Sequence, residues 1–214
     1  MIKIKKQLES KKELMRKLSS DINNCEKCSL YKTRNKPLIG DGPIDVNIMI
    51  VGESPGYYED LKNKAFVGEA GKILDKLLSL IQLGRDEVYI TNILKCHPPK
   101  DQNPSRHEID SCIEYLHKQI DIIEPKIIVT LGKFASREVF TRFNLEFSRI
   151  SELHGKMFTV KTLFSEIKII PLYHPAVACY HKEMFNVLKK DFMNLKQAVD
   201  NINNLKELGE GCEH

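Results

Sequence analysis

Hydrophobic and β-branched residues gather along the chain in four short runs, which are separated by longer segments of mixed character. The runs are Val46–Val51, Val88–Thr91, Lys126–Leu131 and Ile167–Leu172. Short runs rich in Val and Ile are typical of strands that are buried on both faces of a sheet. We therefore predict four β-strands.

The segments between the runs carry hydrophobic residues three and four positions apart, which is the spacing of one face of an α-helix. One such stripe extends over Ile73–Ile81 and a longer one over Ile109–Ile123. Pro104 and a capping box formed by Ser105 and Glu108 mark the start of the second helix. Further helical patterns cover residues 133–140 and 182–198.

The same signals predict the two ends of the chain. Residues 10–22 have one hydrophobic face and are expected to form a helix, with Ser10 and Glu13 as the capping box at its start. The chain ends in the sequence GEGCEH, and we expect a flexible tail from about residue 205 to residue 214.

Strands that alternate with helices predict an α/β fold. We expect a three-layer α/β/α sandwich with a central four-stranded, mainly parallel sheet. Residues 1–214 would form a single domain, in which 1–45 supply an N-terminal helix and a cysteine pair. Ligands bind such folds outside the carboxyl ends of the strands. The segments 52–60, 92–99 and 173–181 leave those ends and are rich in Gly, Pro, His, Asn or acidic residues, so they are expected to converge on one site.

Composition and charge exclude several classes of protein. The 214 residues are 42% hydrophobic and 29% charged, which excludes a disordered chain. No apolar run approaches a membrane span and no signal peptide is evident, so we expect a soluble, cytoplasmic monomer without membrane contact. A complete phosphate loop and a G-x-G-x-x-G motif are both missing, so ATP- or NAD-driven chemistry is not expected. The net charge of +4 permits a polyanionic partner, and the densest basic run, Lys3–Lys17, is either a phosphate contact or a solvated helix face.

Four of the six cysteines form a pattern that suits a metal site. Cys25 and Cys28 form a C-x2-C pair in a polar stretch, Cys96 lies on a loop after a strand, and Cys112 lies on the hydrophobic stripe of the following helix. Four thiols fit a four-thiolate site for zinc or for an iron–sulfur cluster, although Cys112 alone also suits a hydrophobic core. A zinc ribbon would normally show two tight pairs, so the cluster is favoured. The remaining cysteines, Cys179 and Cys212, have no partner pattern.

Single polar or aromatic residues next to the predicted strands could serve a binding site. Glu53 lies in the turn GESPG, where glycines permit backbone N–H groups to face the crevice. Asn92 directly follows a strand and offers a donor together with an acceptor. His174 follows another strand and precedes Pro175, while Phe66 lies before a helix. Each also has a structural interpretation, as a turn, a helix cap or a core aromatic residue.

In combination, GESPGYYED, AFVGEAGKILD, TNILKCHPP and YHPA, with C-x2-C upstream, resemble the family 4 uracil-DNA glycosylases, the iron–sulfur branch of that superfamily. The resemblance extends over residues 20–200. It implies a DNA-repair hydrolase that flips uracil out of DNA, cleaves its N-glycosidic bond, and leaves an abasic site and free uracil. It also implies a 4Fe-4S cluster with a structural rather than a redox role, held by Cys25, Cys28, Cys96 and Cys112.

The resemblance implies a uracil pocket as well. Its members would be the turn residues Gly52, Glu53 and Ser54, the stacking Phe66, the base-reading Asn92, the catalytic His174, and Glu59 near C5 of the base. The family usually has Ala where this chain has Ser54, and we expect Glu53 to act on the water or on the sugar cation. In place of the leucines and arginine that wedge into DNA this chain reads AVACYHK, so the wedge is Val177, Tyr180 or neither. The alternative to an enzyme is a non-catalytic module that senses uracil in DNA and carries a structural metal site.

Overall fold

A five-stranded sheet forms the centre of the computed structural model, which describes residues 2–161 and 166–210. The sheet has the spatial order β2-β1-β3-β5-β4, in which β1, β2, β3 and β5 run parallel and β4 pairs antiparallel with β5. The α/β fold class is therefore as predicted. The strands are β1 (Ile48–Gly52), β2 (Val88–Asn92), β3 (Ile127–Leu131), β4 (Phe158–Lys161) and β5 (Glu166–Leu172).

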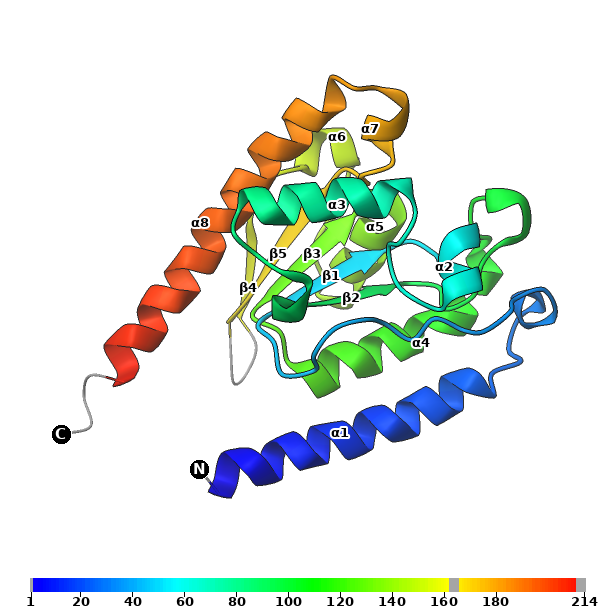
Figure 1. Ribbon diagram of the computed structural model, residues 1–214, viewed down its shortest axis with the longest axis horizontal. Coiled ribbons are helices and arrows are strands. Elements are labelled where there is room, and N and C mark those ends of the chain that lie inside the picture. Colours follow the sequence, from blue (N-terminus) through cyan, green and yellow to red (C-terminus); the bar gives the residue numbers. More distant parts are fainter. Residues whose placement is uncertain (1, 162–165, 211–214) are drawn as a thin grey trace.

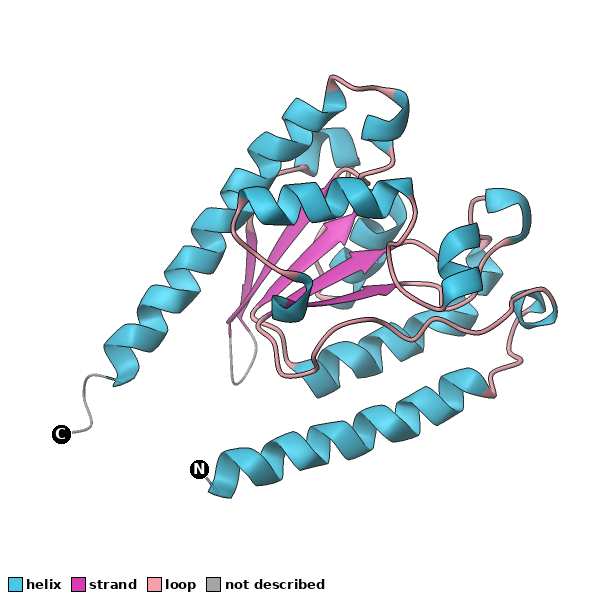
Figure 2. Cartoon of the chain, viewed as in Figure 1, coloured by secondary structure: helices cyan, strands magenta, loops and turns pink. Residues whose placement is uncertain are grey.

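Helices cover both faces of the sheet and make three layers (Figures 1 and 2). Figure 1 shows α3 crossing in front of the sheet beside α8, with α5 behind the sheet and α1 alongside α4. None of the helices within residues 2–161 and 166–210 combines the length and the hydrophobicity that crossing a membrane requires. The helices are α1 (Ile2–Asn23), α2 (Tyr57–Lys62), α3 (Glu69–Leu80), α4 (Arg106–Ile123), α5 (Gly132–Arg142), α6 (Ile150–Leu153), α7 (Val177–Tyr180) and α8 (Met184–Glu210).

The strands β1, β2 and β3 are buried at every position because helices pack on both sides of them. Along β1, Ile48 and Ile50 belong to the hydrophobic core beneath α3 and α8, whereas Met49 and Val51 belong to the core beneath α1, α4 and α5. Successive side chains of a strand point to opposite faces, so a sheet covered twice needs apolar residues throughout. This explains the uninterrupted runs in the sequence.

The fifth strand is a correction to the four-stranded prediction. β4 has four residues, lies at the edge of the sheet, and alternates between half-buried and exposed positions. It reads FTVK and therefore has no hydrophobic run that would announce it. Its register is set by antiparallel pairing with β5, where Phe158 faces Ile169. This is a tertiary constraint that local composition does not carry.

Both terminal helices are longer than predicted. α1 begins at Ile2, so Ser10 lies in the helix interior and the predicted capping box of Ser10 and Glu13 is wrong. α8 continues to Glu210, where a flexible tail was expected from about residue 205, and residues 211–214 lie outside the described part. The capping box of α4 is confirmed: the Glu108 N–H donates to Ser105 Oγ, and the Ser105 N–H donates to Glu108 Oε2.

The parallel strands end together at one edge of the sheet. β1 ends at Gly52, β2 at Asn92, β3 at Leu131 and β5 at Leu172. The register pairs Gly52 with Asn92 and Leu131 with Leu172, so the loops that follow start side by side. The fold thereby gathers residues that are far apart in the sequence.

Candidate active site

A cavity of about 320 Å³ opens at the carboxyl edge of the sheet; we call it the edge cavity. Most of its lining comes from the predicted loops 52–60, 92–99 and 173–181, and Phe66, Ala70 and Gln102 complete it. Six of the seven residues named for a uracil pocket contribute to the lining: Glu53, Ser54, Glu59, Phe66, Asn92 and His174. Their convergence agrees with the expectation that ligand sites form where parallel strands end.

The seventh residue, Gly52, lies directly behind the edge cavity. A Cβ atom at this position would collide with Asn92 Oδ1 and would come within 2.8 Å of Phe66 Cζ. Glycine is therefore needed here because two cavity side chains pass close to the backbone. The end of β1 supports both of them.

Asn92 presents an unsatisfied polar atom at the edge cavity. Its side chain is 2% exposed, and Oδ1 has no hydrogen-bond partner in the described structure. Its backbone carbonyl is occupied, because Lys95 Nζ donates to it at 2.7 Å. Buried polar atoms are nearly always satisfied, so an unpaired acceptor beside a cavity indicates a ligand that completes it.

His174 is held as a neutral donor. The Ala176 backbone N–H donates to Nδ1 of His174 at 3.2 Å, which leaves the ring proton on Nε2. Burial lowers the pKa of His174 from 6.5 to about 4, against a smaller opposing effect of the Glu59 charge. The ring centroid lies 5.6 Å from that of Phe66, with the planes inclined by 30°. Near pH 7 the imidazole therefore offers one N–H group beside an aromatic face.

Glu59 has a structural contact as well as a place in the cavity lining. Its Oε1 accepts hydrogen bonds of 2.9 Å from the backbone N–H groups of Val67 and Gly68. These bonds fix the turn that follows Phe66 and leads into α3. The structure therefore gives Glu59 a role in shaping the loop, which is separate from the predicted contact near C5 of a base.

Glu53 is half-buried, and its burial raises the pKa of its carboxyl group, while the charge of Lys133 acts in the opposite direction. The neighbouring backbone is engaged, because the Leu94 N–H donates to the Glu53 carbonyl at 2.9 Å. A carboxyl group with a raised pKa in a cavity suits proton handling or the stabilisation of positive charge.

Cys25, Cys28, Cys96 and Cys112 line one small enclosed cavity, which we call the cysteine cavity. Their sulfur atoms form no disulfide. Cys179 is exposed on α7 and Cys212 lies outside the described residues. The fold thus brings to one cavity the four thiols that the sequence predicted, although they are separated by up to 87 positions in the chain.

Cationic side chains surround the cysteine cavity. Arg34 Nη1 donates to Cys96 Sγ at 3.1 Å, and Lys95 also lines the cavity with only 1% of its surface exposed. Lys95 Nζ donates to Thr91 Oγ1, the Asn92 carbonyl and Gln119 Oε1, and all three acceptors are neutral. A buried ammonium group needs negative charge nearby. Thiolates at the four cysteines would supply it, so the surroundings fit an anionic metal–thiolate group.

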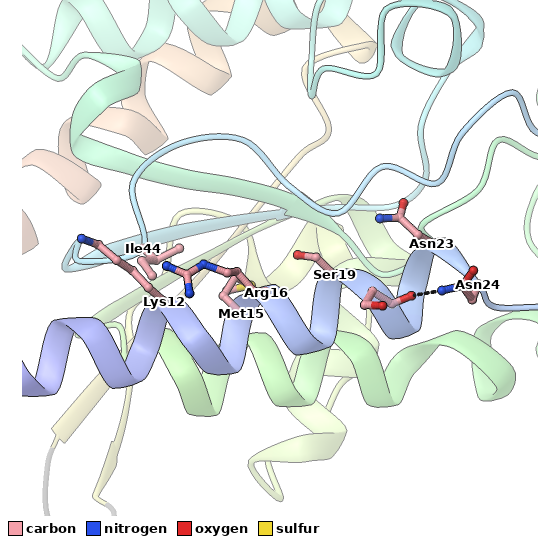
Figure 3. A pocket seen from close by; sticks show the side chains of 8 residues that line it. Lys12, Met15, Arg16, Ser19, Asn23, Asn24 and Ile44 are labelled. Atoms are coloured by element: carbon pink, nitrogen blue, oxygen red, sulfur yellow. Dashed lines mark hydrogen bonds between the residues drawn. The ribbon is translucent and has the colours of Figure 1, made fainter.

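A second, open groove runs along α1 and shares no lining residue with the edge cavity (Figure 3). Its charged side chains are already paired: Lys12 Nζ lies 2.8 Å from Glu9 Oε1, and Arg16 Nη1 lies 2.6 Å from Glu13 Oε2. Asn24 Nδ2 donates to the Ser20 carbonyl. These local pairs are typical of a solvated helix face.

Sequence reasoning overlooks three polar residues near these cavities. Gln102 lines the edge cavity. Lys95 lines the cysteine cavity and also donates to the backbone carbonyl of Asn92 at the edge cavity. Arg85 donates to the two backbone carbonyls that precede the turn held by Glu59. Lys95 and Arg85 hold backbone carbonyls, and no spacing in the sequence reveals such partners. For Gln102 the available signal was the long connection between β2 and α4.

The sequence leaves open whether Val177, Tyr180 or neither would wedge into DNA, and the exposure of the two side chains bears on this choice. Val177 packs against the core beneath α3 and α8, whereas the Tyr180 side chain is 83% exposed at the end of α7. Of these two, Tyr180 is accessible to a large partner.

Known proteins resemble this chain over most of its length. The sequence profile of the Uracil DNA glycosylase superfamily matches residues 39–199. A type-4 uracil-DNA glycosylase of Archaeoglobus fulgidus is 42% identical over 82% of this chain and 88% of the relative. Those of Sulfurisphaera tokodaii and Saccharolobus solfataricus are 40% and 38% identical, over 86% and 85% of this chain and over 84% and 85% of the relatives.

The profile match includes every strand and all the loops that surround the edge cavity. Each of these relatives also aligns with more than four fifths of the chain. The chain therefore belongs to the uracil-DNA glycosylase superfamily, among its type-4 members.

Proposed function

We propose that this chain excises uracil from DNA by hydrolysis of the N-glycosidic bond and releases free uracil at an abasic site. The observation that carries the proposal is the edge cavity, in which a neutral His174, the unpaired Oδ1 of Asn92 and the ring of Phe66 meet. The base must leave the duplex stack to reach such a cavity. Since DNA is the substrate, we place the protein inside the cell.

His174 acts on the leaving base. Breaking the bond between N1 of uracil and C1′ of deoxyribose moves an electron pair onto the base, where charge collects on O2. A donor already aimed at that oxygen lowers the barrier because it needs no reorganisation as the charge develops. The Nε2–H of His174 is that donor, and it remains on the imidazole because the ring is neutral.

Phe66 and Asn92 select the base. The Phe66 ring supplies a flat apolar face for stacking. Asn92 Oδ1 accepts from N3–H of uracil and its Nδ2 donates to O4. Cytosine lacks the N3 proton and carries an amino group in place of O4, so it would leave this amide unsatisfied.

Glu53 serves the sugar side of the reaction. As the bond breaks, positive charge develops at C1′, and a water molecule then adds its oxygen there while its proton ends on the departing uracil. The half-buried Glu53 carboxylate can stabilise that charge and orient the water. Tyr180 is our candidate for the side chain that fills the space left in the duplex, because it is exposed at the end of α7, the short helix after His174.

The test is single-turnover cleavage of a uracil-containing oligonucleotide by wild type and by His174→Ala. Loss of one preorganised donor is expected to slow excision by roughly 10²–10³. DNA binding should change much less, because the interaction strengthens only as charge develops. His107→Ala removes an exposed histidine of α4 and is the matched control. Binding of uracil-containing DNA by a wild type that cleaves nothing would favour the sensor alternative.

We further propose that the cysteine cavity holds a structural 4Fe-4S cluster, with Cys25, Cys28, Cys96 and Cys112 as ligands. All four cysteines line one cavity together with the buried Lys95, which supports a negatively charged group held by four thiolates. The cluster would tie the segment after α1 to the loop after β2 and to α4. It has no part in the cleavage step.

Metal analysis and visible absorption test this assignment. Purified protein is expected to be brown, with about four irons per chain. Cys112→Ala should lose iron and stability, whereas the exposed Cys179→Ala should keep both. A colourless protein with one bound zinc would contradict the cluster.

A further inference from the structure

Phe66 has an unusual backbone conformation. Its φ angle is 51°, in the left-handed region that residues with a side chain seldom occupy. Such a conformation costs free energy and persists only where the surroundings impose it, often at functional sites. The contacts that impose it here are therefore informative.

The segment that follows Phe66 is held by two features. Glu59 Oε1 accepts from the N–H groups of Val67 and Gly68. A Cβ atom at Gly71 would overlap the Phe66 carbonyl, so glycine at this position lets the carbonyl lie against the first turn of α3. These features fix one side of the turn only.

Arg85 holds the other side. Its Nη1 donates to the Ala65 carbonyl at 2.8 Å and its Nη2 donates to the Phe66 carbonyl. The guanidinium is itself anchored, because Nε donates to Asp75 Oδ1 at 2.7 Å and Nη1 lies 3.5 Å from Asp41 Oδ2. All three nitrogen atoms are used, in the planar fork that arginine alone provides.

We propose that Arg85 is a positioning residue for base stacking: it clamps two successive carbonyls, keeps Phe66 in the left-handed conformation, and thereby aims the ring into the edge cavity. The inference rests on the proposed function, since it concerns how the base is received. Arg85 does not line the cavity and so acts through Phe66. The ring it supports lies over Gly52 and beside His174.

Two variants of Arg85 separate positioning from general stability. Arg85→Gln removes the fork, and Arg85→Lys keeps the charge but cannot hold both carbonyls in one plane. Arg142→Gln is the matched control, because Arg142 is similarly buried, at 20% against 26% exposed, and is ion-paired with Asp121 away from the cavity. Each protein is measured for unfolding in urea, for affinity toward free uracil, and for single-turnover excision.

Misplacement of a group that orients the substrate can slow a reaction by up to 10²-fold. We expect Arg85→Gln to slow excision by ten- to a hundredfold and to weaken uracil binding by the folded protein. Arg85→Lys should recover part of both losses, and it carries the comparison if Arg85→Gln does not fold. Arg142→Gln should change neither excision nor uracil affinity. A purely structural role of Arg85 would lower the unfolding midpoint while uracil affinity stays at the wild-type value, and would overturn the proposal.

A double-mutant cycle with Phe66→Ala decides whether Arg85 acts through the ring. In the Phe66→Ala background, Arg85→Gln should slow excision by less than twofold further, because the ring it positions is gone. Equal slowing in both backgrounds would contradict the proposal. A wild type that excises no uracil would instead contradict the proposed function, and the uracil affinities would still test Arg85.

Discussion

At the scale of single residues, the unpaired Oδ1 of Asn92 offers the most direct test of how the protein would distinguish uracil from cytosine. Asn92→Asp would remove the proposed donor to O4 of uracil and leave an acceptor for the amino group of cytosine. We expect the variant to excise uracil more slowly and to gain in the ratio of cytosine to uracil excision. Single-turnover cleavage of matched oligonucleotides measures this ratio, and an unchanged ratio would exclude Asn92 as the residue that reads the base.

His174 also makes stability depend on pH. The unfolded chain takes up a proton on this histidine below about pH 6.5, whereas the folded protein, with a pKa of about 4, does not. Stability is therefore lost as the pH falls from 6.5 toward 4, by about 2 kcal/mol at pH 5. Urea unfolding at pH 7.5 and pH 5 should show this additional loss in wild type but not in His174→Asn. The comparison cancels the contribution of Glu53, which shares the cavity and whose carboxyl pKa is raised by burial.

A sequence can predict a site residue only where its position relative to a strand or helix already indicates where it will lie. Asn92 and His174 could be predicted because each lies within two residues of the end of a hydrophobic run, and parallel strands end at one edge. Arg85 and Lys95 could not, since their partners include backbone carbonyls that only the folded chain brings near. The conformation of Phe66 was equally hidden, because a left-handed phenylalanine has no local signature.

At the scale of elements, α1 depends on its apolar stripe against α4 rather than on its many charges. Ile22 is fully buried in the core that also contains residues of α4. Ile22→Ala should lower the free energy of unfolding by about 2–5 kcal/mol. Leu14→Ala, on the same helix but 51% exposed, should change it by about 0.5 kcal/mol or less. Urea denaturation compares the two, and equal losses would contradict the proposed packing.

Element prediction succeeded where a hydrophobic pattern coincides with a buried surface. The four parallel strands and the capped start of α4 belong to this class. β4 was not predicted because its residues are half-buried or exposed, and because its register is set by pairing with β5. The start of α1 was misplaced because Ser10 with Glu13 imitates a capping box inside a helix that continues through it.

At the scale of the whole molecule, the net charge of +4 predicts weak, salt-dependent attraction to DNA. The position of each charge matters more than the total. The charge of Lys133 acts on Glu53 at the edge cavity, whereas Lys12 of α1 is paired with Glu9. Lys133→Gln should reduce the slope of log K against log salt by about one, and Lys12→Gln should leave it unchanged. Titrations of uracil-free DNA over a range of salt measure both slopes, and the reverse result would assign DNA contact to α1.

The order of the strands also determines when the edge cavity can exist while the chain folds. Its walls come from segments that begin at Gly52 and end beyond His174, and β5 takes its place in the sheet beside β3 only after most of the chain is available. Contacts between such distant positions close large loops and form slowly. A chain interrupted before β5 would contain Phe66 and Asn92 but not His174, the proposed donor to the leaving base. Molecules in which β5 has not yet joined the sheet are therefore expected to bind DNA without cutting it, and the proposed activity would appear only after this strand is in place.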